Sequence, residues 1–442
     1  MKDLRERLVS QGVHTLLAQF TDIHGVAKGK FVPIAHLDEL LTTGAGFAGP
    51  SIWGTGLGRT GKRSEYYGRG NASTATALPW MPGYARIVCD GFVDDEPFDA
   101  CPRQVLRRAT ARLSERGWTL KTGIEPEFFL LQKSQAQARA VDADDQLHKP
   151  SYDLKSLPRQ AALLHEISNG LQQCGLDVFQ IDHEDAHGQY ELNFAYDEAL
   201  HSADHLMLFK LAAHAIAEKH GALFSMMPKP FANQPGSGMH FHVSLWSGHG
   251  EREQCLFASP SKPLSDLAEH FIAGVLEHSA ALCALAAPTV NSYKRLVVGE
   301  SLSGTTWAPA YVAQGPNNRT ASVRTLGGRF EWRVPDAAAN PYLVTAGLIA
   351  AGLDGIDRKL SIPAPCNDDL FALSLAQIRE RRIALLPQSL DQALDALEHD
   401  SVISDALGTP LKSQFLRLKR DEALSYARHV SQWEFERYGA TF

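Results

Sequence analysis

The segment LKTGIEPEFFLL, residues 120–131, is a strand-like run that carries two carboxylates. Glu125 and Glu127 are two positions apart, so the alternation of a strand puts both on one face and leaves apolar side chains on the other. Two like charges at this spacing are unfavourable unless a cation lies between them. The segment therefore predicts a strand with one apolar face, and its acidic face is either a cation site or an exposed polar edge.

A second pair of carboxylates occurs in HEDAHGQYE, residues 183–191. Glu184 and Glu191 flank Gly188, and a hairpin that turns at this glycine would bring both carboxylates to one site. The alternative is that both side chains are solvated charges at a turn.

Two histidines occur in GSGMHFHVS, residues 236–244, where His240 and His242 share one face of a predicted strand. The preceding glycines allow the backbone to approach a ligand closely. Two histidines at this spacing are weakly specific, because each alone is also typical of a hydrogen-bonded core position.

Between residues 294 and 333 the chain has an excess of arginine, the residue best suited to bidentate contacts with carboxylates and phosphates. In GGRFEWR, residues 327–333, two of these arginines share a strand face with Glu331, where cross-strand ion pairs or a solvated basic face are the alternatives. No Walker-type phosphate loop is present, so phosphate binding would depend on metal ions and arginines. The arginines are Arg295, Arg319, Arg324, Arg329 and Arg333.

Together these motifs supply five glutamates and one or two histidines. This oxygen-rich set suits Mg²⁺ or Mn²⁺ better than zinc and is large enough for two or more ions. Metal ions beside anion-binding arginines are typical of phosphoryl transfer from ATP. The sequence thus indicates an enzyme that uses ATP and a substrate with a carboxylate.

The 442 residues are enough for two or three domains. We expect a boundary near residue 101, between an N-terminal domain of short strands and loops (1–101) and a large mixed domain (102–442). Glycine-rich residues 44–70 are expected to form a turned loop and not a core element. A helix should begin at Pro102 and stop at Gly117. The other predicted helices are 159–174, 203–220, 264–287 and a pair after 390, and the other predicted strands are 178–181, 238–245 and 328–334.

The composition excludes several classes of protein. A net charge of −7 argues against binding to nucleic acid or to an anionic membrane surface. The N-terminus has no apolar signal-peptide core, and the most apolar stretch, 271–288, is interrupted by Glu277 and His278. Six scattered cysteines without a CxxC pair are typical of reduced thiols in a cytoplasmic protein.

Six motifs together resemble those of the glutamine synthetase family, and they occur in the same order and with approximately the same spacing. They are GIEPEFF (123–129), HEDAHGQYEL (183–192), PGSGMHFHVSL (235–245), NSYKRLV (291–297), NNRTASVR (317–324) and RFEWRVPDAAANPYL (329–343). The resemblance implies an α+β fold, with a small N-terminal β-grasp domain and a large catalytic domain of antiparallel sheet and helices. It also implies a homo-oligomer, a dodecamer of two hexameric rings with active sites between neighbouring subunits.

The resemblance also implies roles for individual residues, with two or three ions per site. Those resembling ligands of the first metal are Glu127, Glu184 and Glu191, and those of the second are Glu125, His240 and Glu331. Those resembling glutamate-binding and phosphoryl-binding residues are Arg295, Gly236, Arg319 and Arg333, and those resembling ATP contacts are Tyr196, His242, Ser244, Arg324 and Arg329. The implied reaction forms γ-glutamyl phosphate, which an amine then captures.

The chain departs from the family where ammonium binds. Ala48 stands where the family has an aspartate, and the loop after Arg295 carries Trp307 at the position of a glutamate, with Glu300 as a possible substitute. An amine resembling that of lysine, with a pKa about 3.4 pH units above neutrality, costs roughly 4.6 kcal/mol to deprotonate, so a base or anionic pocket is still needed. A more apolar pocket favours methylamine or ethylamine over ammonia.

The segments GAGFAGPSIWGTGL (44–57) and GESLSGTTWAPAY (299–311) resemble those of the γ-glutamylmethylamide synthetase subfamily. The alternatives are an ammonia-dependent glutamine synthetase, a γ-glutamylpolyamine synthetase, and an inactive ring scaffold or nitrogen sensor. A scaffold has no need of the intact metal and arginine positions, which argues against the last of these.

Overall fold

The computed structural model describes residues 2–133, 138–299 and 307–442. The helices are α1 (Lys2–Ser10), α2 (Leu37–Thr42), α3 (Pro102–Ser114), α4 (Ala161–Gln173), α5 (Ala199–Lys219), α6 (Asp266–Glu277), α7 (Ser279–Ala286), α8 (Pro341–Asp357), α9 (Leu375–Glu380), α10 (Leu390–His399), α11 (Ser401–Leu407), α12 (Thr409–Ala427) and α13 (Gln432–Tyr438). The strands are β1 (Thr15–Thr21), β2 (Ala27–Pro33), β3 (Ala45–Ala48), β4 (Glu65–Gly70), β5 (Thr76–Ala77), β6 (Tyr84–Val93), β7 (Glu96–Pro97), β8 (Trp118–Gln132), β9 (Val178–His183), β10 (Gln189–Phe194), β11 (Asp197–Glu198), β12 (Ala222–Ser225), β13 (Met239–Ser247), β14 (Gln254–Cys255), β15 (Tyr311–Val312), β16 (Gln314–Pro316), β17 (Val323–Leu326), β18 (Arg329–Trp332) and β19 (Ala384–Leu385).

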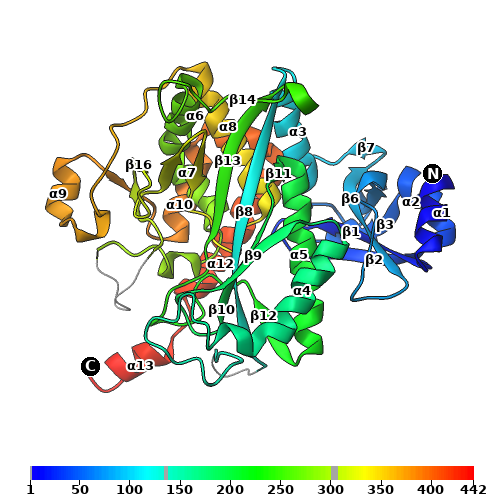
Figure 1. Ribbon diagram of the computed structural model, residues 1–442, viewed down its shortest axis with the longest axis horizontal. Coiled ribbons are helices and arrows are strands. Elements are labelled where there is room, and N and C mark those ends of the chain that lie inside the picture. Colours follow the sequence, from blue (N-terminus) through cyan, green and yellow to red (C-terminus); the bar gives the residue numbers. More distant parts are fainter. Residues whose placement is uncertain (1, 134–137, 300–306) are drawn as a thin grey trace.

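The N-terminal part of the chain forms a mixed sheet in the order β2-β1-β6-β4-β3, in which β1 and β6 are parallel. It lies at one side of the molecule, far from the C-terminus (Figure 1). The expectation of a loop over residues 44–70 is wrong at both ends of that range, because β3 and β4 are strands and Tyr66 is buried. Tyr66 packs against Phe20 and Phe47, and this aromatic contact draws the glycine-rich segment into the core.

A larger sheet forms the middle of the molecule, in the order β16-β17-β18-β13-β8-β10-β9. Its axis is the antiparallel pair β8 and β13, which run side by side over nine residue pairs (Figure 1). Every pairing in this sheet is antiparallel except that of β16 with β17. The expected α+β fold, with an antiparallel sheet and helices, is confirmed.

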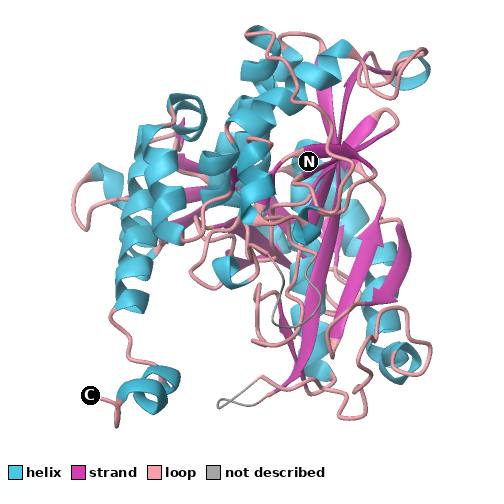
Figure 2. Ribbon diagram, turned by 90° about the vertical axis from the view of Figure 1, so that its left-hand side faces the viewer, coloured by secondary structure: helices cyan, strands magenta, loops and turns pink. Residues whose placement is uncertain are grey.

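Helices cover the apolar face of this sheet, and Figure 2 shows the long strands with helices beside and behind them. Phe241 and Trp332 lie next to each other on neighbouring strands, and Phe271 of α6 packs on Phe330 of β18. Helix α8 is buried along nearly its whole length, between α3, α6 and α11. Among the described residues no helix is both long and apolar enough to cross a bilayer.

Two of the helix predictions need correction. The predicted helix 264–287 is two helices, α6 and α7, which meet at His278. Both ring nitrogens of His278 pair with aspartates, Nδ1 with Asp400 at 2.6 Å and Nε2 with Asp354 at 3.0 Å. The predicted pair of helices after residue 390 is four, α10 to α13. Asp400 begins α11 by accepting a hydrogen bond from the Ile403 amide, so the same aspartate caps one helix and contacts the break in another.

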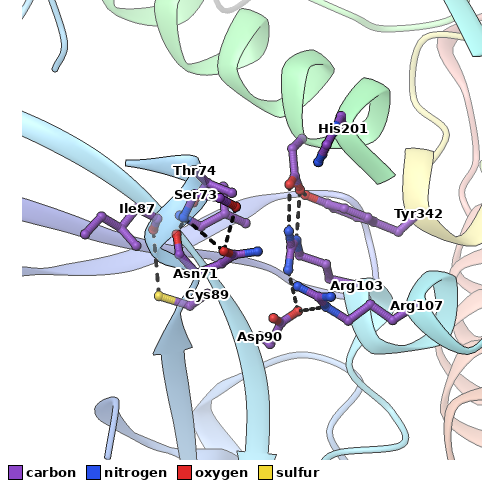
Figure 3. A network of polar contacts seen from close by, with 12 residues as sticks. Asn71, Ser73, Thr74, Ile87, Cys89, Asp90, Arg103, Arg107, His201 and Tyr342 are labelled. Carbon is purple, nitrogen blue, oxygen red and sulfur yellow. Dashed lines mark hydrogen bonds and ion pairs between the residues drawn. The ribbon is translucent and has the colours of Figure 1, made fainter. Parts of the chain in front are cut away.

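A buried ion network joins the N-terminal sheet to the helices of the large part. Arg103 of α3 donates from Nε and Nη2 to both carboxylate oxygens of Asp204 in α5, at 2.9 and 2.7 Å, and from Nη1 to Asp90 of β6. Tyr342 of α8 donates to Asp204 at 2.7 Å, and Arg107 donates to Asp90 (Figure 3). The proposed boundary near residue 101 lies directly before α3, so this network spans it.

Removing one partner of this network should destabilise the fold. Asp204→Asn removes one of the two carboxylates that pair with the buried Arg103, and breaking a buried ion pair costs about 3–5 kcal/mol. The matched control is Asp38→Asn, whose ion pair with Arg5 is exposed and contributes about 1 kcal/mol or less. Urea unfolding followed by circular dichroism measures both variants. Equal midpoints for the two would contradict the assignment.

Candidate active site

The pairing of four strands gathers the predicted chemistry on the other face of the large sheet. Glu125 of β8 lies opposite His240 of β13, and His242 lies opposite Glu331 of β18. On the other side of β8, Glu127 lies opposite Glu191 of β10. Directly opposed side chains in antiparallel strands have Cβ atoms about 5 Å apart, so the register alone brings these groups together.

The predicted hairpin around Gly188 is confirmed. Strands β9 and β10 pair, Glu184 follows β9, and the Glu184 amide donates to the Gln189 carbonyl at 2.9 Å. Gly188 has φ +69° and its amide donates to Asp145, so the turn requires a residue that tolerates a left-handed backbone. Glu184 and Glu191 thereby face the same cavity from the two sides of the hairpin.

One half of the site is a cluster of carboxylates that form no ion pair with a lysine, arginine or histidine within the described parts of the chain. Oxygens of Glu184, Glu191 and Asp182 lie within 4.8 Å of one another. Burial, and then the negative charges of neighbouring carboxylates, raise the pKa of Glu184 and of Glu191 well above the usual value. Asn193 and Gln189 donate to Glu191 and Glu127, at 3.0 and 2.9 Å, but these amides add no positive charge.

The other half of the site pairs its carboxylates with histidines and arginines. Glu331 accepts hydrogen bonds from Arg333 at 2.5 Å and from Arg324 at 2.7 Å, and Glu125 accepts one from His242 at 2.9 Å. Burial alone would raise the pKa of both glutamates, but His240 and these partners more than offset it. The pKa of Glu331 falls to about 2, and that of Glu125 also falls well below its usual range.

Both halves line one cavity of about 1340 Å³. Arg295 is buried in its wall, where its guanidinium donates to the carbonyls of Arg333, Val334 and Pro335 at 3.1–3.3 Å. Arg319 is exposed at the cavity, and its carbonyl accepts a hydrogen bond from Arg333. The cavity therefore offers buried carboxylates at one place and several guanidinium groups beside them.

Most of the residues predicted from the sequence line this cavity. They are Glu125, Glu127, Glu184, Glu191, His240, Glu331, Gly236, Arg295, Arg319, Arg333, Trp307, Tyr196, His242, Ser244, Arg324 and Arg329. His242, expected at ATP, lies within 4.8 Å of Glu125 and Glu331, in a group that could also hold a metal ion.

Two predicted residues stand apart. Ala48 lies on β3 of the N-terminal sheet and is not among the described residues that line the cavity. Glu300 lies outside the described residues, so its role stays a prediction.

Sequence reasoning missed several residues of the cavity. Asp182 is two positions before Glu184, so the alternation of a strand would have placed it on the same face. Tyr152 has φ +62°, and its side chain is largely exposed. The partial burial of its hydroxyl, and then the negative charge of Glu184 and neighbouring carboxylates, raise the pKa of that hydroxyl. Asp185 accepts hydrogen bonds from Ser151 and Trp307. No local pattern marks Tyr152 or Asp185, because loops far apart in the chain bring them to the cavity.

The donor set fits divalent metal ions. The repulsion between buried carboxylates raises the pKa values of Glu184 and Glu191 in addition to burial, and a bound cation would remove this repulsion. Carboxylate oxygens with at most one histidine in each group suit Mg²⁺ or Mn²⁺. Three groups of described residues each bring ligand atoms within 4.8 Å of one another. They are Asp182 with Glu184 and Glu191, Glu125 with Glu191 and His240, and Glu125 with His242 and Glu331.

Thermal unfolding with and without divalent cations tests this reading independently of activity. In EDTA, Glu191→Gln should unfold at or above the wild-type temperature, because it relieves repulsion. With Mg²⁺ or Mn²⁺ the wild type should gain several degrees, about 2.7 kcal/mol at one hundred times Kd, and Glu191→Gln clearly less. Glu277→Gln, at an exposed residue of α6, is the control and should respond like the wild type. Equal gains for all three proteins would contradict a metal site here.

Comparison with known proteins agrees with this geometry. The glutamine synthetase catalytic domain matches residues 99–438. The chain is 49% identical over 440 residues to a glutamate–methylamine ligase of Methyloversatilis universalis, covering 99% of this chain and 98% of that protein. It is 37% identical to a glutamine synthetase of Rhizobium meliloti, with 98% of each chain covered.

Two solved structures have the same fold. One is described as a GmaS/ADP complex, with a TM-score of 0.92, 35% identity and 99% of each chain covered. The other is described as GmaS without ligand, with a TM-score of 0.91, 34% identity and 100% of each chain covered. Sequence, fold and the arrangement of carboxylates and arginines agree, and the chain belongs to the glutamine synthetase family.

Proposed function

We propose that this protein is an ATP-dependent ligase that joins the γ-carboxyl group of glutamate to a small primary amine, with methylamine as the preferred amine. The observation that carries the proposal is 49% identity, over 99% of the chain, to a glutamate–methylamine ligase. The cavity supports it, because the carboxylates and arginines that such a reaction needs lie together there. A structural relative described as an ADP complex supports ATP as the phosphoryl donor.

The first step requires anions to be held together in one place. A γ-carboxylate oxygen of glutamate attacks the γ-phosphorus of ATP, a new O–P bond forms, and the bond to the β,γ-bridging oxygen breaks to release ADP. Arg295 and Gly236 are proposed to bind glutamate, and Arg319 and Arg333 to contact the γ-carboxylate and the transferred phosphoryl group. Guanidinium groups stabilise the charge on the equatorial oxygens in such a transfer. The proposed ATP contacts are Tyr196, His242, Ser244, Arg324 and Arg329.

We propose two or three Mg²⁺ or Mn²⁺ ions per site. Glu127, Glu184 and Glu191 would hold one ion, and Glu125, His240 and Glu331 another. Bound there, the ions would neutralise charge on the nucleotide phosphates and orient them. In the described structure Arg333 and Arg324 neutralise Glu331, so metal binding and release of these guanidinium groups toward an anionic substrate are expected to be linked.

In the second step the amine nitrogen attacks the γ-carbonyl carbon of γ-glutamyl phosphate, the C–N bond forms and inorganic phosphate leaves. An alkylammonium ion must lose its proton before this attack and a second proton during it. Ala48 and Trp307 stand where the family has carboxylates. They favour an amine with an alkyl group, because burying that alkyl group in an apolar pocket is favourable. Glu300 stays a candidate for the missing carboxylate.

Ammonia is the second candidate amine. It is supported by full-length relatives that are glutamine synthetases at 36–38% identity. A polyamine and a scaffold without turnover are the remaining alternatives, and the assay below separates all four.

We also propose a cytoplasmic ring-shaped homo-oligomer, a dodecamer of two hexamers. Ala48 lies on the N-terminal sheet and not at the cavity of its own chain, as expected if it faces the cavity of a neighbouring subunit. Helix α13 projects from the body of the molecule (Figure 1), and its Trp433 and Phe435 are 62% and 67% exposed. Exposed aromatic side chains of this kind are typical of an interaction surface. Six free cysteines fit a reducing compartment.

Steady-state kinetics tests the amine. Purified protein with Mg²⁺, ATP and glutamate is given ammonium, methylamine, ethylamine or putrescine, and ADP release and the amide product are both measured. We expect the highest kcat/KM for methylamine, because the pocket has lost the family's ammonium-site carboxylates at Ala48 and Trp307. Glu331→Ala removes a proposed metal ligand and should reduce kcat by at least about a hundredfold. A higher kcat/KM for ammonium or putrescine would replace methylamine, and no turnover with any amine would favour the scaffold.

Light scattering tests the assembly. The full chain should have the mass of a dodecamer, and the double variant Trp433→Ser, Phe435→Ser should shift towards smaller assemblies, because the aromatic contact of α13 is lost. Leu375→Ser, at an exposed residue of α9, should leave the mass unchanged. A monomeric wild type would contradict the proposed ring.

A further inference from the structure

A further carboxylate, that of Asp185, lines the cavity beside the proposed metal ligands. Asp185 directly follows Glu184 in the turn between β9 and β10 and lines the cavity. It is not a member of any of the three groups of possible metal ligands among the described residues. Burial raises the pKa of Glu184, and the negative charge of Asp185 adds to that effect together with those of Glu127 and Asp182.

Two separate loops converge on Asp185. The indole Nε1 of Trp307 donates to Asp185 Oδ2 at 2.5 Å, and the Ser151 hydroxyl donates to Oδ1. The backbone of Trp307 is also fixed, because its carbonyl accepts a hydrogen bond from Arg333 at 3.3 Å. Trp307 therefore spans from a proposed phosphoryl contact to Asp185, and it is the residue that stands at the family's glutamate position.

The remaining hydrogen-bonding capacity of Asp185 suits a cation. A carboxylate has about four lone-pair positions, and the two donors from protein use one on each oxygen. Trp307, which contacts Asp185, and Tyr152 are aromatic residues that line the same cavity. A carboxylate beside aromatic faces binds an alkylammonium ion through charge and through the ring faces, while the alkyl group is sheltered from water.

We infer that Asp185 and Trp307 form the amine subsite, in which the Asp185 carboxylate binds the ammonium group and fixes the indole of Trp307 against the alkyl group. The subsite rests on the proposed function, since it takes the amine of that reaction. Asp185 supplies the negative charge that Ala48 has lost, from within the same chain as the metal site.

Asp185→Asn tests the inference, since asparagine keeps the size and an oxygen acceptor for the Trp307 indole but removes the charge. We expect the KM for methylamine to rise about tenfold or more, the loss typical of a weakened hydrogen bond to a charged group. The KM values for ATP and glutamate should change less than twofold. Slow glutamate-dependent ADP release without amine should persist, because it reports the first step alone.

Two further variants separate binding from a structural role. Asp177→Asn removes a carboxylate from an exposed residue outside the cavity and should leave all KM values unchanged. Trp307→Phe removes the donor to Asp185, and it should raise the methylamine KM more in the wild type than in Asp185→Asn, as expected for coupled residues.

An unchanged methylamine KM in Asp185→Asn would overturn the inference, and so would equal rises for all three substrates. If the wild type instead prefers ammonium, the proposed amine fails, but the same comparison is made on the KM for ammonium. The two failures are therefore distinguishable.

Discussion

The chemistry of this protein depends on the register of β8 between β13 and β10. That register places four carboxylates, Glu125, Glu127, Glu191 and Glu331, on one sheet face within reach of one another. Buried like charges are strongly unfavourable, and their mutual repulsion has to be offset by cations. The guanidinium groups of Arg324 and Arg333 at the cavity wall supply part of this positive charge.

The two halves of the site meet the constraint differently. Around Glu331 and Glu125, the positive charges come from the protein itself, through Arg333, Arg324 and the histidines. Around Glu184 and Glu191 the described hydrogen-bond donors are neutral amides, and further carboxylates add negative charge, so a cation from solution would be needed to offset the repulsion there. The apolar side of the same sheet is covered by α3, α5 and α6, and α8 packs behind them, which fixes the strands on which both halves depend.

The proposed specificity for the amine depends on residues beside the proposed metal ligands and not on those ligands themselves. In the proposed reaction the carboxylates and arginines serve phosphoryl transfer to glutamate. The proposed amine subsite consists of a different set of groups, Trp307 and Asp185, which come from a loop and a turn. A change in the accepted amine can therefore arise by substitution in these segments without disturbing the strand register.

By itself the sequence determined what is local. Alternation along β8, β13 and β18 placed glutamates, histidines and arginines on one face, and Gly188 marked the hairpin that brings Glu184 towards Glu191, because strand period and turn chemistry depend on neighbouring residues alone. Only the tertiary structure decided which of these groups meet. The contact of Glu125 with His242, the packing of Tyr66 that makes strands of a glycine-rich segment, the break at His278 and the contact of Asp185 with Trp307 all join residues far apart in the chain. Such contacts depend on how whole elements pack, which no local pattern encodes.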